Sequence, residues 1–280
     1  MAGQSANEEG VRRGRSGLFV YNVALIVSAA VLAPLIAVAC LLRPRWRERL
    51  GDRFGLGWPE SSPRPTLWAH GASVGEVEGI APLLQRWKDE NPGGRIVVSS
   101  LTATGCAAAT RAVPGAEVRA FPLDFPGIPG RVVRRLSPDL FLFSENELWP
   151  NALTSLSSLR VPSIQVSGRL SERAARALER TPGLAGSILS SVTRFCVQSP
   201  DDEARLLALG ADADCIVVTG SLKGDGRRVP TPPFVSREVV AHASFTPHSL
   251  SRSRSRRERR WAPRRRRRRR GGPRASLSVS

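Results

Sequence analysis

The sequence has few of the residues that form covalent or metal cross-links. Its 280 residues include four cysteines and three histidines. There is no Cys-x-x-Cys pair, and no pair of histidines lies near a cysteine. The pattern gives no support for a disulfide framework or a zinc site, and it favours a reducing compartment. We expect Cys40, Cys196 and Cys215 to act as small apolar side chains, the last two in strands.

Acidic residues are also scarce, with 24 Asp and Glu against 42 Lys and Arg and a net charge of +18. Residues 251–280 hold 14 Arg and one Glu, which accounts for +13 of this charge. The other 250 residues therefore carry only +5. Because the excess is confined to one end, the charge alone does not indicate a protein that binds nucleic acid.

One long stretch has no charged residue. Residues 18–42 form an apolar run of 25 residues, interrupted by Asn22 and Pro34. A helix of this length measures roughly 37 Å, enough to cross a hydrocarbon core of about 30 Å with some tilt. A cleaved signal peptide is the alternative, but the run is long for one and a basic cluster follows it. The sequence therefore predicts one membrane-anchor helix.

Arginines on both sides of this run predict its orientation. Those before it are partly offset by Glu8 and Glu9. Five arginines follow the run, so we expect the body of the protein on the cytoplasmic side. Residues 43–65 should form a basic membrane-proximal segment on anionic lipids, with Trp46 at the headgroup level. The arginines that follow the run are Arg43, Arg45, Arg47, Arg49 and Arg53.

From residue 66 onward, short apolar runs alternate with amphipathic stretches. The spacing predicts an α/β fold with a doubly wound parallel sheet and helices on both faces. Ligands of such sheets bind in the loops at the carboxyl ends of the strands. We expect strands at 66–70, 95–99, 117–120, 139–143, 163–166, 194–197 and 215–219. We expect helices at 77–90, 103–112, 130–136, 148–159, 171–180, 184–191 and 200–209.

The loop after the first of these strands contains a single carboxylate. The segment Trp68-Ala-His-Gly-Ala-Ser-Val-Gly-Glu76 joins a buried strand to a helix, where backbone N–H groups are exposed. Glu76 has two interpretations at this point. It is either a helix-start carboxylate that complements the helix dipole, or a catalytic group. The local sequence does not separate them.

Three later strand-end loops also contain polar residues. Thr102-Ala-Thr-Gly105 is typical of a helix capped by threonine. The segment Ser144-Glu-Asn-Glu-Leu-Trp-Pro-Asn151 favours a functional site, because a cap does not need two carboxylates, an amide and a Trp. Arg169, in the loop 167–172, is placed to meet an anionic ligand, with a structural ion pair as the alternative.

Six segments, in order and in spacing, carry a family resemblance: HGASVGE, TATG, FPLDFPG, SENELWPN, SGRLSERA and VTGSLK. Together they resemble the 3-deoxy-D-manno-octulosonic-acid (Kdo) transferases, bacterial inner-membrane enzymes that add Kdo to a lipid A precursor. The N-terminal apolar helix and Arg53-Phe-Gly55 also fit, so the resemblance covers about 18–223. It implies a GT-B glycosyltransferase without a cofactor. A Rossmann-like N-terminal domain would meet the acceptor, and a second domain would hold the CMP-Kdo donor.

The resemblance also implies roles for individual residues. Glu76 would be the general base that accepts the proton of the attacking sugar hydroxyl, with inversion of the Kdo centre. Asn146 stands where the family usually has a small hydroxyl residue. The family does not depend on an Asp-x-Asp metal site, so Asp212-Ala-Asp214 is expected to be a solvated loop. The implied substrate-binding residues are Ser73, Gly75, Glu145, Glu147, Arg169 and Lys223, the last two through phosphate or carboxylate groups.

The C-terminal part departs from the resemblance. We expect an N-terminal segment at 1–17, the anchor at 18–42, and an acceptor-binding domain at 66–225. Residues 226–280 would form an Arg-rich disordered tail in place of the donor domain, since they lack apolar periodicity. One hypothesis is a shifted reading frame, which second-domain motifs in another frame of the gene would support. The other is a polycationic tail that binds anionic lipid or nucleic acid.

Three functions stay open from the sequence. The first is Kdo transfer from CMP-Kdo to a lipid A precursor at the inner membrane, with the catalytic domain on the cytoplasmic face. The second is a membrane-anchored module that binds acceptor lipid without transfer. The third is nucleic-acid binding through the Arg tail, although no specific nucleic acid is expected as a partner.

Overall fold

The computed structural model describes residues 2–42 and 48–222, except the side chains of 2–15 and of Cys40. Trp46, Lys223 and the tail from residue 226 lie outside the described residues, and so do Arg43, Arg45 and Arg47. The predictions made for them therefore stay predictions.

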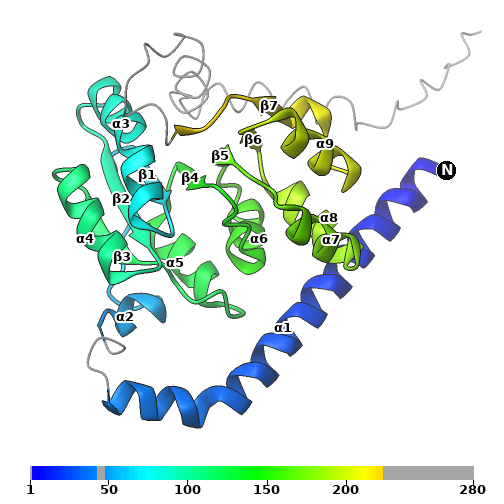
Figure 1. The fold of residues 1–280 in the computed structure, drawn as a ribbon, viewed down its shortest axis with the longest axis horizontal. Coiled ribbons are helices and arrows are strands. Elements are labelled where there is room, and N and C mark those ends of the chain that lie inside the picture. Colours follow the sequence, from blue (N-terminus) through cyan, green and yellow to red (C-terminus); the bar gives the residue numbers. More distant parts are fainter. Residues whose placement is uncertain (1, 43–47, 223–280) are drawn as a thin grey trace, which may run out of the picture. The chain divides into compact units, whose positions relative to one another are not determined.

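Seven parallel strands form one sheet in the order β3-β2-β1-β4-β5-β6-β7 (Figure 1). This arrangement confirms the predicted parallel α/β fold. The last strand is shorter than predicted, because Cys215 ends a 3₁₀ helix, η2 (Ala213–Cys215), where it is half-buried. The expectation that Cys215 is a buried strand residue was therefore wrong. The strands are β1 (Thr66–His70), β2 (Arg95–Ser100), β3 (Glu117–Ala120), β4 (Leu140–Ser144), β5 (Ser163–Gly168), β6 (Arg194–Val197) and β7 (Ile216–Val218).

Several helices begin at residues whose side chains accept a free N–H group of the first turn. Ser73 caps α3, Thr102 caps α4 and Ser171 caps α7, each by accepting a hydrogen bond from a backbone N–H three residues later. The threonine cap predicted for the 102–105 loop is thus confirmed. The helices are α1 (Ala2–Leu42), α2 (Leu50–Arg53), α3 (Val74–Glu90), α4 (Ala103–Ala112), α5 (Ile128–Leu136), α6 (Pro150–Ser158), α7 (Glu172–Glu179), α8 (Pro182–Ser191) and α9 (Pro200–Ala208).

Alternating side chains of the strands enter two separate cores, one on each face of the sheet. Leu67 and Ala69 of β1 lie in the core under α3 and α4. Trp68, between them, lies in the core of the opposite face with residues of α5, α6 and α8. Both faces are therefore covered, which explains why the strands read as continuous apolar runs.

The strand order places two loops together that are far apart in the sequence. β1 pairs with β2 on one side and with β4 on the other, so the direction of strand succession reverses at this point. Such a switch point opens a crevice at the carboxyl ends of the two strands. The short loop that leads to Glu76, in the first turn of α3, follows β1, and the loop with Glu145 and Glu147 follows β4.

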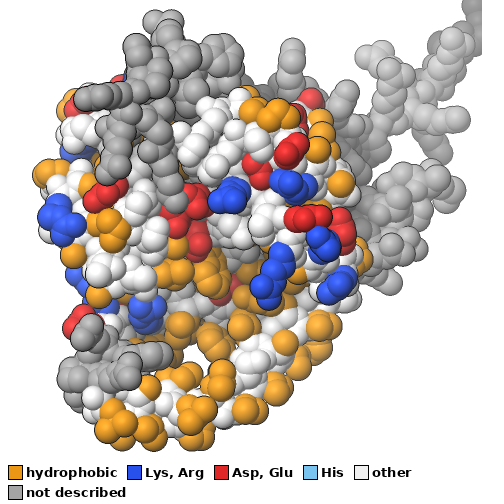
Figure 2. Space-filling view, in the orientation of Figure 1, with side chains coloured by type: hydrophobic (Ala, Val, Ile, Leu, Met, Phe, Trp, Pro, Cys, Tyr) orange, Lys and Arg blue, Asp and Glu red, His pale blue; other side chains and the backbone are white. Residues whose placement is uncertain are grey.

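Helix α1 contacts the sheet domain along one side. It packs on α8, where Gly17 lies so close to Leu184 that a Cβ atom would be 2.3 Å from the Leu184 nitrogen. The Tyr21 hydroxyl donates to Asp124, and Asn22 accepts from the side chain of Asn151 at 2.7 Å. Its other sides expose a row of apolar side chains (Figure 2). Residues 16–39 are long and apolar enough to cross a membrane.

The first residues after α1 that the structure describes bind to the sheet domain. Arg49 donates to the Val118 carbonyl and Arg53 to the Leu101 carbonyl. Trp58 is buried and packs against Trp68, with ring centroids 5.2 Å apart. Within the segment 43–65, Arg49, Arg53 and Trp58 therefore contact the sheet domain.

Asp124 should make stability depend on pH. Burial raises its pKa to about 6, although hydrogen bonds from Asn151 and Ala152 oppose this. Since the pKa is higher in the folded than in the unfolded protein, its stabilising contribution is complete below about pH 4 and is lost as pH rises through about 6. Over this range we expect the free energy of unfolding to fall by up to about 3 kcal/mol more in the wild type than in Asp124→Asn. Chemical denaturation at several pH values measures this, and equal slopes would contradict it.

Candidate functional site

Glu76 lies in the first turn of α3 and is buried, with 8% of the residue exposed. One carboxylate oxygen accepts the Ala72 N–H at 3.0 Å, and the other accepts the Ser73 hydroxyl at 2.9 Å. The Glu76 N–H donates in return to the Ser73 oxygen. Glu76 and Ser73 therefore form a reciprocal cap of the helix. The structural interpretation of Glu76 is confirmed, and each carboxylate oxygen retains a lone pair for another partner.

The surroundings of Glu76 favour a carboxyl group that holds a proton readily. Burial raises its pKa, because the charged form loses water. The hydrogen bonds from Ala72 and Ser73 lower the pKa in part, and the charges of Glu145 and Glu147 raise it further. The charges of the three carboxylates therefore interact at the switch point.

The loop that carries Glu145 and Glu147 has a constrained backbone. Glu145 adopts φ +51°, which lies in the left-handed region. This region is unfavourable in free energy for residues other than glycine. Its N–H donates to the Val166 carbonyl, and its own carbonyl accepts from the Gln165 side chain. Neighbouring strand β5 therefore holds the turn in this conformation and directs the following residues toward β1.

Glu147 is bound from two sides. Its Oε2 atom accepts the indole N–H of Trp149 at 2.7 Å, and it lies 3.4 Å from Nε2 of His70. Trp149 in turn packs near Phe121, with ring centroids 5.8 Å apart. The side chain of Glu147 is 16% exposed and that of His70 is fully buried. The arrangement links the end of β1 to the start of α6 through one carboxylate.

The other predicted site residues differ in how closely they meet the three carboxylates, and Ser73 is hydrogen-bonded to Glu76. Ser73 and Gly75 are exposed at the start of α3, next to Glu76. Arg169 is exposed after β5, and within residues 48–222 no hydrogen bond or ion pair joins it to the three carboxylates. In the same part of the chain, no three His, Cys, Asp or Glu side chains are arranged to hold a metal ion.

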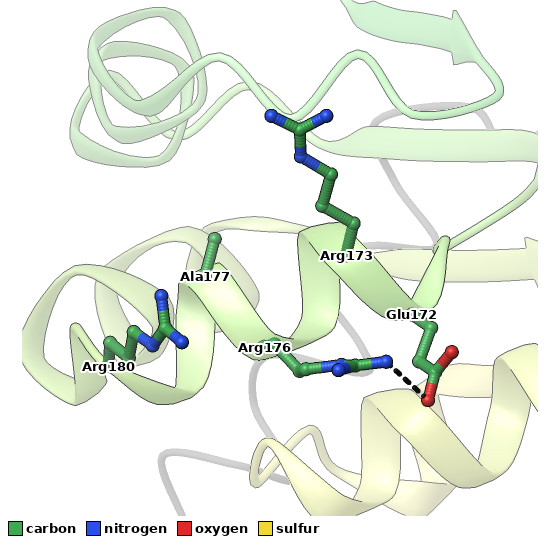
Figure 3. Close-up of a pocket in the computed structure, with 5 residues that line it drawn as sticks. All are labelled: Glu172, Arg173, Arg176, Ala177 and Arg180. Carbon is green, nitrogen blue, oxygen red and sulfur yellow. Dashed lines mark ion pairs between the residues drawn. The ribbon is translucent and has the colours of Figure 1, made fainter.

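A hollow of about 410 Å³ lies elsewhere, on the surface of α7 (Figure 3). Arg176 is paired with Glu172 at 2.7 Å, and Arg173 points away from this pair. Glu76, Glu145 and Glu147 form what we call the carboxylate cluster. The hollow shares no residue with this cluster, so it does not define the candidate site. Its lining residues are Glu172, Arg173, Arg176, Ala177 and Arg180.

Sequence reasoning missed the partners that hold the site together. In the sequence, His70 ends a predicted buried strand and opens the HGASVGE segment, with no role assigned to its side chain. A polar residue that ends such a strand, just before a glycine, is the signal that could have identified it. Asn22 interrupts the apolar run 18–42 in the sequence, and in the structure it accepts a hydrogen bond from Asn151. Asp124 was not singled out, although it accepts the N–H groups of Asn151 and Ala152 at the start of α6.

Comparison with known proteins supports the resemblance drawn from the motifs. Residues 45–226 match the family described as 3-deoxy-D-manno-octulosonic-acid transferase (kdotransferase). The chain belongs to this family. The matched region includes the whole sheet and all three carboxylates of the cluster.

Individual members of the Kdo transferase family are also similar to this chain in sequence. The 3-deoxy-D-manno-octulosonic acid transferase of Chlamydophila psittaci is 35% identical over 215 residues, which are 76% of this chain and 50% of the relative. The enzyme of that name in Haemophilus influenzae is 29% identical over 210 residues, 74% of this chain and 49% of the relative. The chain therefore spans about half the length of these curated relatives.

Solved structures give a weaker similarity. A putative UDP-N-acetylglucosamine 2-epimerase from Listeria monocytogenes matches with a TM-score of 0.43 and 13% identity, covering 57% of this chain and 46% of that chain. The UDP-GlcNAc 2-epimerase from Neisseria meningitidis matches with a TM-score of 0.43 and 12% identity, covering 57% and 48%. At this level of similarity, the two epimerases do not indicate a function for this chain.

Proposed function

We propose that the chain acts in Kdo transfer from CMP-Kdo to a lipid A precursor, with the acceptor bound at the carboxyl ends of β1 and β4. The observation that carries this proposal is the buried carboxylate of Glu76 beside Glu145 and Glu147, in a chain of the Kdo transferase family. In this proposal the sheet domain is the acceptor-binding half of a GT-B enzyme.

Glu76 would act as the general base. The acceptor hydroxyl oxygen forms a bond to the Kdo anomeric carbon while the bond from that carbon to the phosphate oxygen of CMP breaks. The hydroxyl proton passes to a free lone pair of Glu76, and one direct displacement inverts the anomeric centre. A base with a raised pKa suits this role, because it holds the proton more firmly after transfer. Ser73, Gly75, Glu145, Glu147, Arg169 and Lys223 would contact the substrates.

Helix α1 would anchor the protein in the inner membrane as a single span, with the sheet domain on the cytoplasmic face. On insertion, the contacts of Tyr21 and Asn22 with the sheet domain would open. The apolar stretch 16–39 supports an anchor by its length and composition. Anionic lipids would be the partner of the basic residues that follow it. An anchor at the membrane would keep the site close to a lipid acceptor.

The proposal is tested by turnover of the purified chain in lipid vesicles. We expect release of CMP from CMP-Kdo that depends on lipid A precursor in the same vesicles. CMP release without the acceptor would instead show hydrolysis of the donor. Vesicles without CMP-Kdo, used in a lipid-binding measurement, give the affinity for the acceptor separately.

A second function has one observation in its favour. Glu76, Glu145 and Glu147 all lie in the sheet domain that we propose binds the acceptor, so a module that binds the acceptor lipid without transfer is the alternative. Saturable binding of lipid A precursor without CMP release would identify this module. Absence of both binding and turnover would contradict both functions.

A further inference from the structure

The side chain of His70 is held in one orientation by its neighbours. It ends β1 and is completely buried. Its ring stacks on Phe121, with centroids 4.0 Å apart and an angle of 30° between the planes. The stack fixes the plane of the ring, and the contacts of Nδ1 with Ser99 and of Nε2 with Glu147 favour this orientation over the one turned by 180°.

The partners of Nδ1 show that this nitrogen carries a hydrogen. It lies 3.0 Å from the Ser99 carbonyl oxygen and 3.2 Å from the Ser99 hydroxyl. A carbonyl oxygen can only accept. The hydroxyl hydrogen of Ser99 is used on the Ala69 carbonyl, so this hydroxyl also presents a lone pair to the ring. The assignment follows from the donor and acceptor inventory, because a histidine nitrogen between acceptors must donate.

The second nitrogen then faces a carboxylate. In a neutral imidazole with its hydrogen on Nδ1, Nε2 presents a lone pair. The partner of Nε2 is Oε2 of Glu147 at 3.4 Å, an oxygen that already accepts from Trp149. Two lone pairs would oppose each other in a buried place, where such contacts cost the most. One additional proton between the two atoms converts this repulsion into a charge-assisted hydrogen bond.

We propose that His70 and Glu147 share a proton, and that His70 is a positioning residue for Glu147. The pair fixes the Glu147 carboxylate between the imidazole and the Trp149 indole. It also removes one negative charge from a cluster that contains Glu76 and Glu145. The role in catalysis rests on the proposed function, whereas the shared proton is a property of the folded chain and is testable without turnover.

The hydrogen position is measured by nitrogen-15 NMR of the histidine rings in the folded chain at about pH 7. The signals of His70 are those that His70→Gln removes. We expect an Nδ1 signal of the protonated type and an Nε2 signal moved from the unprotonated position toward the protonated one. An Nε2 signal at the unprotonated position would overturn the proposal.

Replacement of the carboxylate tests the partner without changing the histidine. In Glu147→Gln, we expect the Nε2 signal to move back toward the unprotonated position, because an amide cannot supply the shared proton. Glu78→Gln is the matched control, since Glu78 is exposed on α3. It should leave the His70 signals unchanged. An Nε2 signal that is the same in Glu147→Gln and the wild type would overturn the proposal.

Two variants of His70 separate positioning from packing. The amide of His70→Gln can still donate to Glu147, whereas His70→Leu fills the space without donating. We expect the Trp149 fluorescence, taken as the difference from Trp149→Phe, to stay near that of the wild type in His70→Gln and to shift in His70→Leu. Equal fluorescence in both variants would contradict a positioning role, whatever the outcome of the CMP-release assay.

Discussion

Replacing Glu76 by glutamine is expected to lower Kdo transfer about 10²- to 10⁴-fold, the usual contribution of a general base. Glutamine has nearly the same shape, and its amide oxygen can still accept a hydrogen bond from Ala72 or Ser73. It cannot accept the proton of the acceptor hydroxyl. The helix cap is therefore largely retained while the proposed base is lost, and CMP release in vesicles measures the difference.

The pH dependence of the transfer rate gives an independent test of Glu76 as the general base. A general base works only when ionised, so transfer by the wild type should rise as pH increases through the raised pKa of Glu76. This rise should be absent from Glu76→Gln. Glu78→Gln, exposed two residues away on the same helix, should keep both the rate and the pH profile. Transfer by Glu76→Gln at the wild-type rate would exclude Glu76 as the base.

Replacing Trp68 by alanine is expected to lower the free energy of unfolding by about 3–5 kcal/mol. Trp68 has no exposed surface and lies in the centre of the core that α5, α6 and α8 cover. The centroid of its ring lies 4.5 Å from that of Phe141 and 5.9 Å from that of Phe121. The indole N–H also donates to Ser99, so truncation leaves a cavity and removes a buried hydrogen bond.

Chemical denaturation measures the effect of Trp68→Ala directly. Phe54→Ala is the control for loss of an aromatic ring, because Phe54 is 47% exposed. We expect this control to change stability by no more than about 0.5 kcal/mol. Similar losses in the two variants would show that the core around Trp68 relaxes to fill the cavity.

The regular part of the fold was predictable because each element carries its own signal. Strand β1 was placed at Thr66–His70 from its apolar run alone, and Ser171 was recognised as a helix start. Helix α3 begins three residues earlier than predicted, at Val74, because Ser73 caps it. Because Gly75 is in the first turn, the apolar periodicity that predicted the helix begins only after this turn. Local chemistry therefore determined these elements, and the errors lie at their ends.

The connections within the site were not predictable from local patterns. Glu147 and His70 are 77 residues apart, and their contact depends on β1 and β4 being neighbours. Strand order is a property of the whole sheet. Likewise, Asn22 lies in an apolar run whose hydropathy indicates an anchor and says nothing about Asn151. The motif of the family identified the carboxylates, and only the structure shows what holds them.

The pairing of β1 with β4 has a consequence for how this protein folds during synthesis. When the ribosome has released the chain only as far as β3, strand β1 still lacks its second neighbour and presents an open edge. The crevice cannot exist until β4 has docked on that edge, so Glu76 stays apart from Glu145 and Glu147 up to that step. Like charges are thus brought together late, when the packing of both sheet faces can offset their repulsion.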